Sequence, residues 1–580
     1  MTATSTTDRI LVLDADLAPA LSVARSLREI GLVVDVASHV DKPLTGYSRA
    51  IAACRIYPDP LSQPDAFIGW MHEVTRADRY ALIIPVTERT LAPLLRQRER
   101  VDDRRIAMAP TESLKIALDK AATVALAESV GIPVPRSVRV SRLDALPAAR
   151  AQFDFPIVIK PVSSVGTDHA RNVQLTVSYA FDDNELRAHV AHALRFGEVI
   201  LQEYFRGEGE GIELLADHGE VVYAFQHRRL HEVPLTGGGS SLRMSVDIAP
   251  ALLDAARRLM AAMQWHGVAM VEFKHDPASG QFRLMEVNGR FWGSLPLAAA
   301  AGANFPAMLY TLLCKGRAEL SAPARPGVIC RNLTRDVDWF EHIACRNAPP
   351  RLVRIPSWGS VLKDTALCLH WRHRFDVQRL SDPLPGLVDL QRIVSSYWQR
   401  YRRRRADAHL LAAQRKAWAN GTVRQALRSA DRVLFVCYGN INRSAVAHCL
   451  ASAALPDTVR VDSAGFHTQA QRPADPVMVD VAQARATDLS AWSSTHLSAD
   501  MANAASVVFV MELAHLKAMQ ANFPDASRRT FLLGMAAPLA DENGEIPDPY
   551  GKPVAVYERV FDQVTRNVKA LTALLAASRP

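Results

Sequence analysis

The sequence predicts a multidomain chain that combines α/β and α+β folds. Its 580 residues are enough for several domains of ordinary size. A strand–helix–strand pattern runs through residues 10–38, and a similar alternation restarts at Arg432, whereas strand-like segments dominate residues 155–289. These observations place a small doubly wound domain at the N-terminus, an α+β domain after it, and an α/β domain at the C-terminus.

Bulk composition indicates an ordinary globular protein. Hydrophobic residues make up 49% of the chain and charged residues 22%. The seven cysteines are scattered and form no CxxC pair, so neither a zinc knuckle nor a disulfide framework is indicated, and a reducing cytoplasm is expected. The N-terminus lacks the pattern of a signal peptide, and the longest apolar stretch, at 295–313, is too interrupted for a membrane span.

The first domain is predicted to cover residues 1–110. ILVLDAD (10–16), LVVDVAS (32–38) and YALIIPV (80–86) are apolar runs typical of buried strands. An amphipathic stretch that ends before Gly31 separates the first two runs. This spacing favours a parallel sheet with crossover helices, which is the doubly wound arrangement.

The second domain is predicted to cover residues 111–318. Residues 111–135 look helical and stop at the segment from Gly131 to Pro135. Strand-like segments follow at 155–161, 198–205, 220–226, 268–276 and 282–289. Residues 319–430 are expected to form the tail of this domain and a basic helical linker, and residues 431–580 the C-terminal domain.

A basic run at Arg400 and Arg402–Arg405 stands out within the linker. A solvated helix face explains such a run, and so does peripheral contact with an anionic membrane surface or with a membrane-associated kinase. The sequence shows no aromatic-interleaved basic platform of the kind that supports nucleic-acid binding, so no nucleic-acid partner is expected.

RVLFVCYGNINRSAVAHCLA (432–451) carries the spacing of an anion-binding loop. A strand leads into Cys437, and five residues later Arg443 opens a helix whose N–H groups can surround one phosphate. The guanidinium can grip two phosphate oxygens, and the same positive field favours the thiolate form of the cysteine. Gly439 permits close backbone approach, Asn440 tolerates left-handed geometry, and the Ser444 hydroxyl can bond the sulfur.

A thiolate that attacks phosphorus also needs an acid for the leaving oxygen. EIPDPYGK (545–552) places Asp548 between two prolines, which would hold its carboxyl group on a stiff loop. An ordinary Pro-Asp turn has the same sequence. The presence of the cysteine loop favours the catalytic interpretation.

These residues resemble the low-molecular-weight protein tyrosine phosphatases, over about residues 430–580. The resemblance implies an α/β fold for this domain, with a four-stranded parallel sheet and flanking helices. The matching features, in order, are CxGNxxRS, VDSAG (461–465), RPADP (472–476), VVFVMELAH (507–515) and DPY (548–550). The resemblance implies Cys437 as nucleophile, Arg443 as phosphate ligand, Asp548 as general acid, and Ser463 as support for Asn440. DLSAWSSTHLS (488–498) looks like the bacterial branch that controls exopolysaccharide export.

The sequence departs from that family at three positions. Asn442 replaces a second cysteine, so the protective disulfide of the family cannot form. Trp492 replaces the histidine that buttresses the loop, which puts loop rigidity in question, and Ala445 replaces a proline. Ile441 is a branched aliphatic residue, which favours phosphotyrosine, and no cysteine follows Cys449 to support arsenate reduction.

A second chemical motif lies at VEFKHDPASGQFRLMEVNGR (271–290). Glu272 and Glu286 fall on neighbouring strand candidates, and alternation puts Glu286, Asn288 and Arg290 on one face. Carboxylate and amide oxygens are ligands that suit Mg²⁺, or Mn²⁺, and the arginine beside them can contact a phosphate. Acids on an exposed strand edge would give the same pattern if each stood alone.

Together with the upstream residues this motif resembles the ATP-grasp superfamily, in particular its carbamoyl-phosphate-synthase-like branch, over about residues 10–315. The resemblance implies that Lys120 and Lys160 bind ATP phosphates. It also implies that Glu203 and the Phe205 backbone hold the adenine, and that Arg290 contacts the transferred phosphate beside a metal held by Glu272, Glu286 and Asn288. The loop SSVGTDHA (163–170) would cover the phosphates. His169 is either a phosphate contact or, as the preferred interpretation, an ordinary surface histidine.

The preferred interpretation is a bifunctional enzyme. An ATP-grasp ligase, which activates a carboxylate as an acyl phosphate for a nucleophile, is fused to a phosphotyrosine phosphatase. One alternative is a phosphatase regulated by an ATP-binding sensor that ligates nothing, and another is a scaffold with a silent phosphatase. Expected partners are small-molecule carboxylates and nucleophiles and a phosphotyrosine protein such as a bacterial tyrosine kinase.

Overall fold

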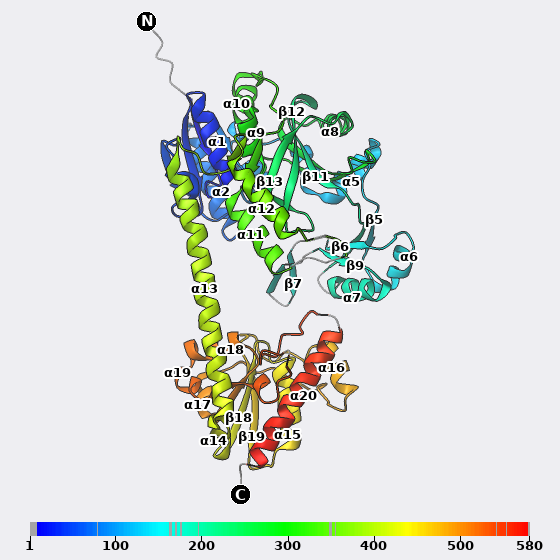
Figure 1. Cartoon of the computed structure of the whole chain (residues 1–580), viewed down its shortest axis with the longest axis vertical. Coiled ribbons are helices and arrows are strands. Elements are labelled where there is room, and N and C mark those ends of the chain that lie inside the picture. Colours follow the sequence, from blue (N-terminus) through cyan, green and yellow to red (C-terminus); the bar gives the residue numbers. More distant parts are fainter. Residues whose placement is uncertain are drawn as a thin grey trace. The chain divides into compact units, whose positions relative to one another are not determined.

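The computed structural model describes residues 8–77, 79–161, 165–168, 171–174, 177–194, 197–346, 351–353, 355–540, 542–552 and 554–577. The chain divides into two compact units, Met1–Arg136 with Tyr204–Ser396 and Ser137–Glu203 with Tyr397–Pro580. Both units combine sheets with covering helices (Figure 1). Short 3-10 turns occur at Leu44–Tyr47, Arg98–Arg100, Asp103–Arg105, Leu143–Ala145, Leu367–Leu369 and Leu533–Met535.

The N-terminal sheet is parallel, with the strand order β3-β2-β1-β4. Its elements are β1 (Arg9–Val12), α1 (Ala18–Glu29), β2 (Val33–Ser38), β3 (Ala53–Ile56), α2 (Pro64–Arg76), β4 (Leu82–Ile84) and α3 (Glu88–Arg96). The apolar runs become strands because helices cover both faces: Leu27 of α1 packs into one core and Phe67 of α2 into another. The predicted doubly wound domain is confirmed.

A seven-stranded sheet forms the middle of the chain, in the order β15-β14-β11-β12-β13-β16-β17. Its pairs are antiparallel except for β16 and β17, which are parallel. Its strands are β11 (Glu208–Asp217), β12 (Glu220–Val233), β13 (Gly239–Val246), β14 (Gly267–His275), β15 (Phe282–Asn288), β16 (Ile329–Arg331) and β17 (His373–Phe375). Beyond the predicted boundary at residue 318, β16 and β17 extend this same sheet.

Helices cover this sheet and create its core. Leu252 and Met260 of α8 pack with the buried Trp265 and with inward residues of β11 and β14. The helices of this part are α4 (Thr111–Leu118), α5 (Lys120–Ser129), α8 (Pro250–Met263), α9 (Leu295–Ala301), α10 (Phe305–Lys315), α11 (Leu333–Ala344) and α12 (Trp358–Ala366). The predicted α+β fold is confirmed here.

A smaller sheet contains residues 137–203, in the order β5-β10-β6-β9. Its elements are β5 (Ser137–Val140), α6 (Leu146–Arg150), β6 (Ile157–Pro161), β9 (Ser178–Ala180), α7 (Asp183–Leu194) and β10 (Val199–Glu203). β7 (Val165–Asp168) and β8 (Arg171–Gln174) pair with each other. Residues 163–164 and 169–170 of the predicted phosphate-covering loop, His169 included, lie outside the described residues.

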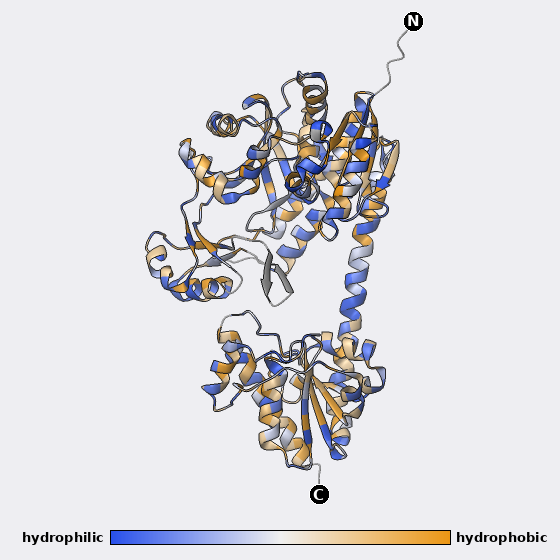
Figure 2. Cartoon of the chain, turned by 180° about the vertical axis from the view of Figure 1, so that it is seen from behind, coloured by the Kyte–Doolittle hydropathy of each residue, from blue (hydrophilic) through white to orange (hydrophobic). Residues whose placement is uncertain are grey.

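The C-terminal sheet is four-stranded and entirely parallel, in the order β19-β18-β20-β21. Figure 2 shows hydrophobic residues along these strands, as expected for a sheet covered on both faces. The strands are β18 (Arg432–Cys437), β19 (Arg460–Gly465), β20 (Val507–Val510) and β21 (Thr530–Leu532). The helices are α15 (Arg443–Ala454), α16 (Pro476–Gln483), α17 (Ala499–Ala504), α18 (Leu513–Asn522), α19 (Pro524–Ser527) and α20 (Val554–Ala576).

The predicted basic linker is helical. It forms α13 (Pro383–Ala419) and α14 (Thr422–Arg428). At the end of α13, the Gln414 side chain donates to the Thr530 carbonyl at 3.3 Å and accepts from the Leu532 N–H at 2.9 Å. These bonds fasten the last turns of α13 to the edge strand β21.

Among the described residues, no single helix has both the length and the apolar composition to cross a membrane. Helices α9 and α10 pass that test only when taken together, and they bend by 93° at their junction.

Candidate functional site

The parallel C-terminal sheet places the cysteine loop where such sheets bind ligands. β18 lies inside the sheet and ends at Cys437, and α15 begins at Arg443, so the loop lies at the carboxyl end of a central strand. The Cys437 sulfur is 2.9 Å from the Ser444 hydroxyl and accepts the Asn440 N–H at 3.2 Å. Both contacts can stabilise negative charge on the sulfur.

Asn440 holds the shape of this loop. It is fully buried and has a φ of +53°, in the left-handed region that asparagine tolerates. Its side-chain amide donates to the hydroxyls of Ser444 and Ser463 at 2.9 Å and 3.0 Å, and its side-chain oxygen accepts the Thr495 N–H at 2.8 Å. The structure thus brings together Asn440 and Ser463, the pair that the family resemblance implied.

Trp492 supports the cysteine loop at the position where the resembled family has a histidine. Its indole N–H donates to the Asn440 carbonyl at 2.7 Å. The ring also makes an edge contact with His448, with centroids 5.2 Å apart. The loss of the family histidine therefore does not leave this carbonyl without a donor.

Arg443 is almost completely buried under the loop. Its guanidinium donates to the Ile546 carbonyl at 2.9 Å and pairs with Glu512 at 2.7 Å and Asp548 at 3.0 Å. Burial alone would lower the pKa of Arg443, but Asp548, Cys437 and Glu512 raise it above its ordinary value. Its Nε atom is buried without a hydrogen-bond partner among the described residues, so a donor remains for an anion in the loop.

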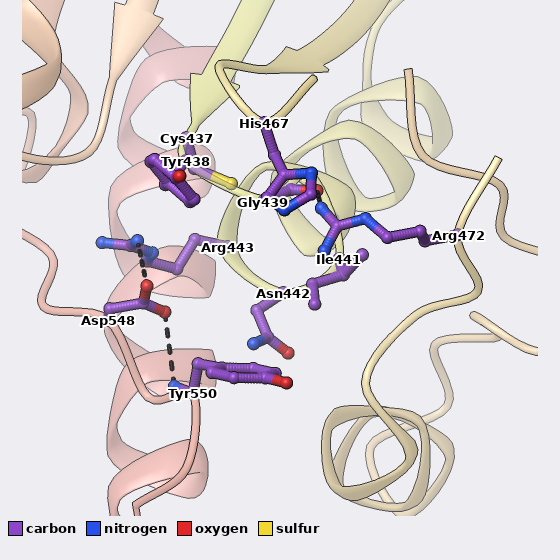
Figure 3. A pocket seen from close by; sticks show the side chains of 10 residues that line it. All are labelled: Cys437, Tyr438, Gly439, Ile441, Asn442, Arg443, His467, Arg472, Asp548 and Tyr550. Carbon is purple, nitrogen blue, oxygen red and sulfur yellow. Dashed lines mark hydrogen bonds and ion pairs between the residues drawn. The ribbon is translucent and has the colours of Figure 1, made fainter. Parts of the chain in front are cut away.

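Asp548 reaches the same pocket from the loop before α20. Figure 3 shows its carboxylate between the Arg443 guanidinium and the Tyr550 backbone, whose N–H it accepts at 3.3 Å. The side chain keeps 38% of its surface exposed, so a proton can exchange with solvent. Three predicted catalytic residues of this domain, Cys437, Arg443 and Asp548, therefore line one pocket. Asn440 and Ser444 are hydrogen-bonded to the Cys437 sulfur and to each other.

Sequence reasoning missed two residues that shape the pocket. Glu512 fixes Arg443, and Arg472 donates to the Gly439 carbonyl at 2.6 Å. Both lie inside quoted family segments, but nothing in their local sequence shows that they point toward residues far away in the chain. Tyr438, His467 and Tyr550 complete the rim together with Ile441.

A buried histidine supports Glu512. The Nδ1 atom of His515 accepts the Glu512 backbone N–H at 3.2 Å, which requires that nitrogen to be unprotonated. Burial and the nearby Arg443 charge lower the pKa of His515 to about 3. The imidazole is therefore neutral at physiological pH and adds no charge beside the guanidinium.

The predicted metal ligands lie together in the other unit. Glu272 on β14 pairs in register with Glu286 on β15, and the Asn288 side chain lies 3.2 Å from the Glu286 carboxylate. All three line a cavity of about 450 Å³. Arg290 lines the same cavity and pairs with Glu88 at 3.1 Å.

The electrostatics of this cavity fit a divalent cation. Burial raises the pKa of Glu272, although Arg229, which pairs with it at 2.5 Å, acts against that shift. Two carboxylates side by side with an amide oxygen are a hard donor set that Mg²⁺ accepts. A bound cation would also relieve the repulsion between Glu272 and Glu286.

Arg243 of β13 lines the same cavity. Its guanidinium is 2% exposed and pairs with Asp376 at 2.5 Å. Arg228 pairs with Glu208 and Glu210 and is one-third exposed.

The predicted nucleotide contacts lie on several elements. Lys120 begins α5, directly after the N-cap Asp119. Lys160 lies on β6 and Glu203 ends β10, two strands that pair with each other. The Phe205 ring lies under the Arg283 guanidinium at 4.9 Å.

Two models of known protein families match this chain, each over a different part of it. Residues 432–580 match the family model described as low molecular weight phosphotyrosine protein phosphatase, and residues 195–335 match ATP-grasp in the biosynthetic pathway with Ter operon. The low molecular weight protein-tyrosine-phosphatase Etp of Escherichia coli (strain K12) is 35% identical over 136 residues, which are 23% of this chain and 88% of Etp.

For the N-terminal half, the carbamoyl phosphate synthase large chain of Acidobacterium capsulatum is 22% identical over 272 residues, 45% of this chain and 24% of that protein. The crystal structure of N5-carboxyaminoimidazole synthetase from Staphylococcus aureus matches with a TM-score of 0.46 and 12% identity, over 59% of this chain and 87% of that one.

Proposed function

Since this chain belongs to the low molecular weight protein-tyrosine-phosphatase family through residues 432–580, we propose that Cys437, Arg443 and Asp548 carry out its phosphatase reaction. The chain fuses this phosphatase domain to an ATP-grasp ligase domain. The observation that carries the catalytic assignment is the convergence of the Cys437 sulfur, the Arg443 guanidinium and the Asp548 carboxylate on one pocket.

The proposed reaction has two displacement steps. The Cys437 thiolate attacks phosphorus, and the bond from phosphorus to the tyrosine oxygen breaks as Asp548 gives that oxygen its proton. Water then attacks the phosphocysteine, Asp548 takes a proton back, and the sulfur leaves as a thiolate. Arg443 and the loop N–H groups hold the phosphate oxygens, and Ser444 donates to the departing sulfur.

The pocket supports a phosphotyrosine protein as substrate. Ile441, Tyr438 and Tyr550 give the rim apolar and aromatic surface that can flank a phenyl ring. A bacterial tyrosine kinase is the partner proposed from the resemblance to exopolysaccharide phosphatases. All seven cysteines are free thiols, which supports a reducing compartment such as the cytoplasm.

For the ATP-grasp domain we propose an ATP-dependent carboxylate ligase. Glu272, Glu286 and Asn288 would hold Mg²⁺ or Mn²⁺, whose charge neutralises the phosphates of ATP when bound. Lys120, Lys160, Glu203 and Phe205 would bind the nucleotide, and Arg290 would bind the transferred phosphate. The substrates would be a small carboxylate, activated as an acyl phosphate, and a nucleophile that displaces the phosphate.

The ligase proposal is tested by ADP release from MgATP, using the Cys437→Ser protein with pooled carboxylates and amines. This substitution prevents the phosphatase from removing a phosphorylated product. Release that needs one pool and is lost in Glu286→Ala, but not in the control Glu220→Ala at the exposed first residue of β12, supports a ligase. Tight ATP binding without release in any pool favours the ATP-sensor alternative.

The basic run supports a further partner, an anionic membrane surface. Arg400 and Arg402–Arg405 are exposed on α13, beside Trp398 and Tyr401, whose side chains are 60% and 52% exposed. Aromatic and basic side chains together are typical of contacts at a lipid headgroup layer. Binding to phosphatidylglycerol vesicles that falls with salt supports this partner, and equal binding to neutral vesicles contradicts it.

A further inference from the structure

Two histidines and one aspartate meet at the ends of interior strands of the seven-stranded sheet and do not line the cavity of Glu272 and Glu286. Asp217 ends β11, His218 occupies the turn into β12, and His266 directly precedes β14. Their nearest ligand atoms all lie within 4.8 Å of one another. No role in either proposed activity uses these three side chains.

The distances suit a transition-metal ion. His266 Nδ1 is 3.1 Å from the Asp217 carboxylate, and His218 Nε2 is 3.8 Å from the same oxygen. Ligands of a tetrahedral zinc ion lie about 3.3 Å apart, because each bond is about 2.0–2.1 Å long. The two imidazole rings stack with centroids 4.4 Å apart, and a ligand nitrogen of each lies within 4.8 Å of the other.

The backbone around the cluster is held in place. Asp217 pairs with Glu220 across the hairpin, and Ala216 pairs with Gly267 on the neighbouring strand. The Gly219 N–H donates to the Trp265 carbonyl at 2.7 Å, which ties the turn to the segment that carries His266. Trp265 is itself fully buried, so the segment that carries His266 is anchored in the core. A metal could therefore bind these ligands without rearranging the strand ends that carry them.

The exposed surface of the three side chains leaves room for further ligands to a metal ion. The side chains of His266, Asp217 and His218 are 21%, 41% and 78% exposed, so one side of the cluster faces solvent. His266 Nδ1 has no hydrogen bond of good geometry among the described residues, although the carboxylate is close. Imidazole and carboxylate ligands with an open position match the preferences of Zn²⁺ and its neighbours in the periodic table.

We propose that Asp217, His218 and His266 form a binding site for a divalent transition metal, with Zn²⁺ as the best match. The ion would join the β11–β12 turn to the start of β14. This site is independent of the ATP-grasp and phosphatase assignments.

Two substitutions remove ligands without disturbing the fold. Asp217→Asn keeps the side-chain shape and removes the charge. His218 has a φ of +46° and is followed by Gly219 with a φ of +91°, a two-residue hairpin turn in which Asn-Gly is strongly favoured. His218→Asn should therefore preserve or improve the turn while it deletes one imidazole.

The test is calorimetric titration of ZnCl2 into the full chain after chelator treatment, with thermal unfolding measured with and without zinc. Both variants should weaken this binding event by at least about tenfold and reduce the zinc-dependent rise in Tm. The control His72→Ala, an exposed histidine on α2, should bind like the unchanged chain. Zinc binding that is absent from the unchanged chain, or unaltered in both variants, overturns the proposal.

Discussion

Replacing Trp492 by phenylalanine tests whether the indole takes over the buttress of the phosphate loop. The change keeps an aromatic ring beside His448 and removes one N–H group, the donor to the Asn440 carbonyl at 2.7 Å. Asn440 is fully buried, so its carbonyl would lose a partner that water cannot readily replace. Leaving a buried acceptor unsatisfied costs about 1–3 kcal/mol.

If this whole cost falls on the loop conformation that binds phosphate, kcat/KM for an aryl phosphate should fall about 5- to 150-fold. The assay compares Trp492→Phe with Trp398→Phe, a substitution of an exposed tryptophan on α13 that should leave the rate unchanged. Inhibition by inorganic phosphate should weaken in parallel, because the same loop binds the product. A Trp492→Phe enzyme within twofold of the unchanged chain would refute the assigned role of the indole.

Three further predictions concern the same pocket. Asp548→Asn should lower kcat for phosphotyrosine by about 10²- to 10⁴-fold and should affect nitrophenyl phosphate less, since a good leaving group needs little protonation; equal losses on both substrates would contradict the acid role. Asn440→Ala should lower the Tm more than Asn440→Gly, by the equivalent of about 1–2 kcal/mol. Of these two replacements, only glycine keeps a φ of +53° without strain. Equal Tm values for the two variants would contradict this. The pKa of His515 is lowered from 6.5 to about 3, so between these pH values the unfolded state binds a proton that the folded state does not. Stability should therefore fall as the pH drops through this window, by up to about 1.4 kcal/mol per unit, and His515→Gln should flatten that slope in thermal inactivation of the phosphatase.

Much of the phosphatase pocket could be predicted because its chemistry is local in sequence. Cys437, Asn440, Arg443 and Ser444 lie on one strand, loop and helix start, and that order alone arranges their groups around an anion. Glu512 and Trp492 could not be assigned in the same way. Their contacts with Arg443 and Asn440 depend on how β20 and the segment after α16 pack against the loop.

The seven-stranded sheet shows a different limit of prediction from sequence. The strand predicted at 220–226 continues as β12 to Val233. His227 and Arg229 of this strand face the cavity, so the buried side is polar and the usual apolar alternation is hidden. For a similar reason the short strands β16 and β17, among many arginines and prolines, gave no periodic signal.

The most direct test of the central claim is hydrolysis of phosphotyrosine by the full chain and by Cys437→Ser. The account predicts that the substitution abolishes hydrolysis while phosphate still binds, and that acid quenching of the unchanged enzyme during turnover traps phosphate on Cys437. Hydrolysis that survives in Cys437→Ser, or trapped phosphate on another residue, would contradict the assignment of Cys437 as the nucleophile.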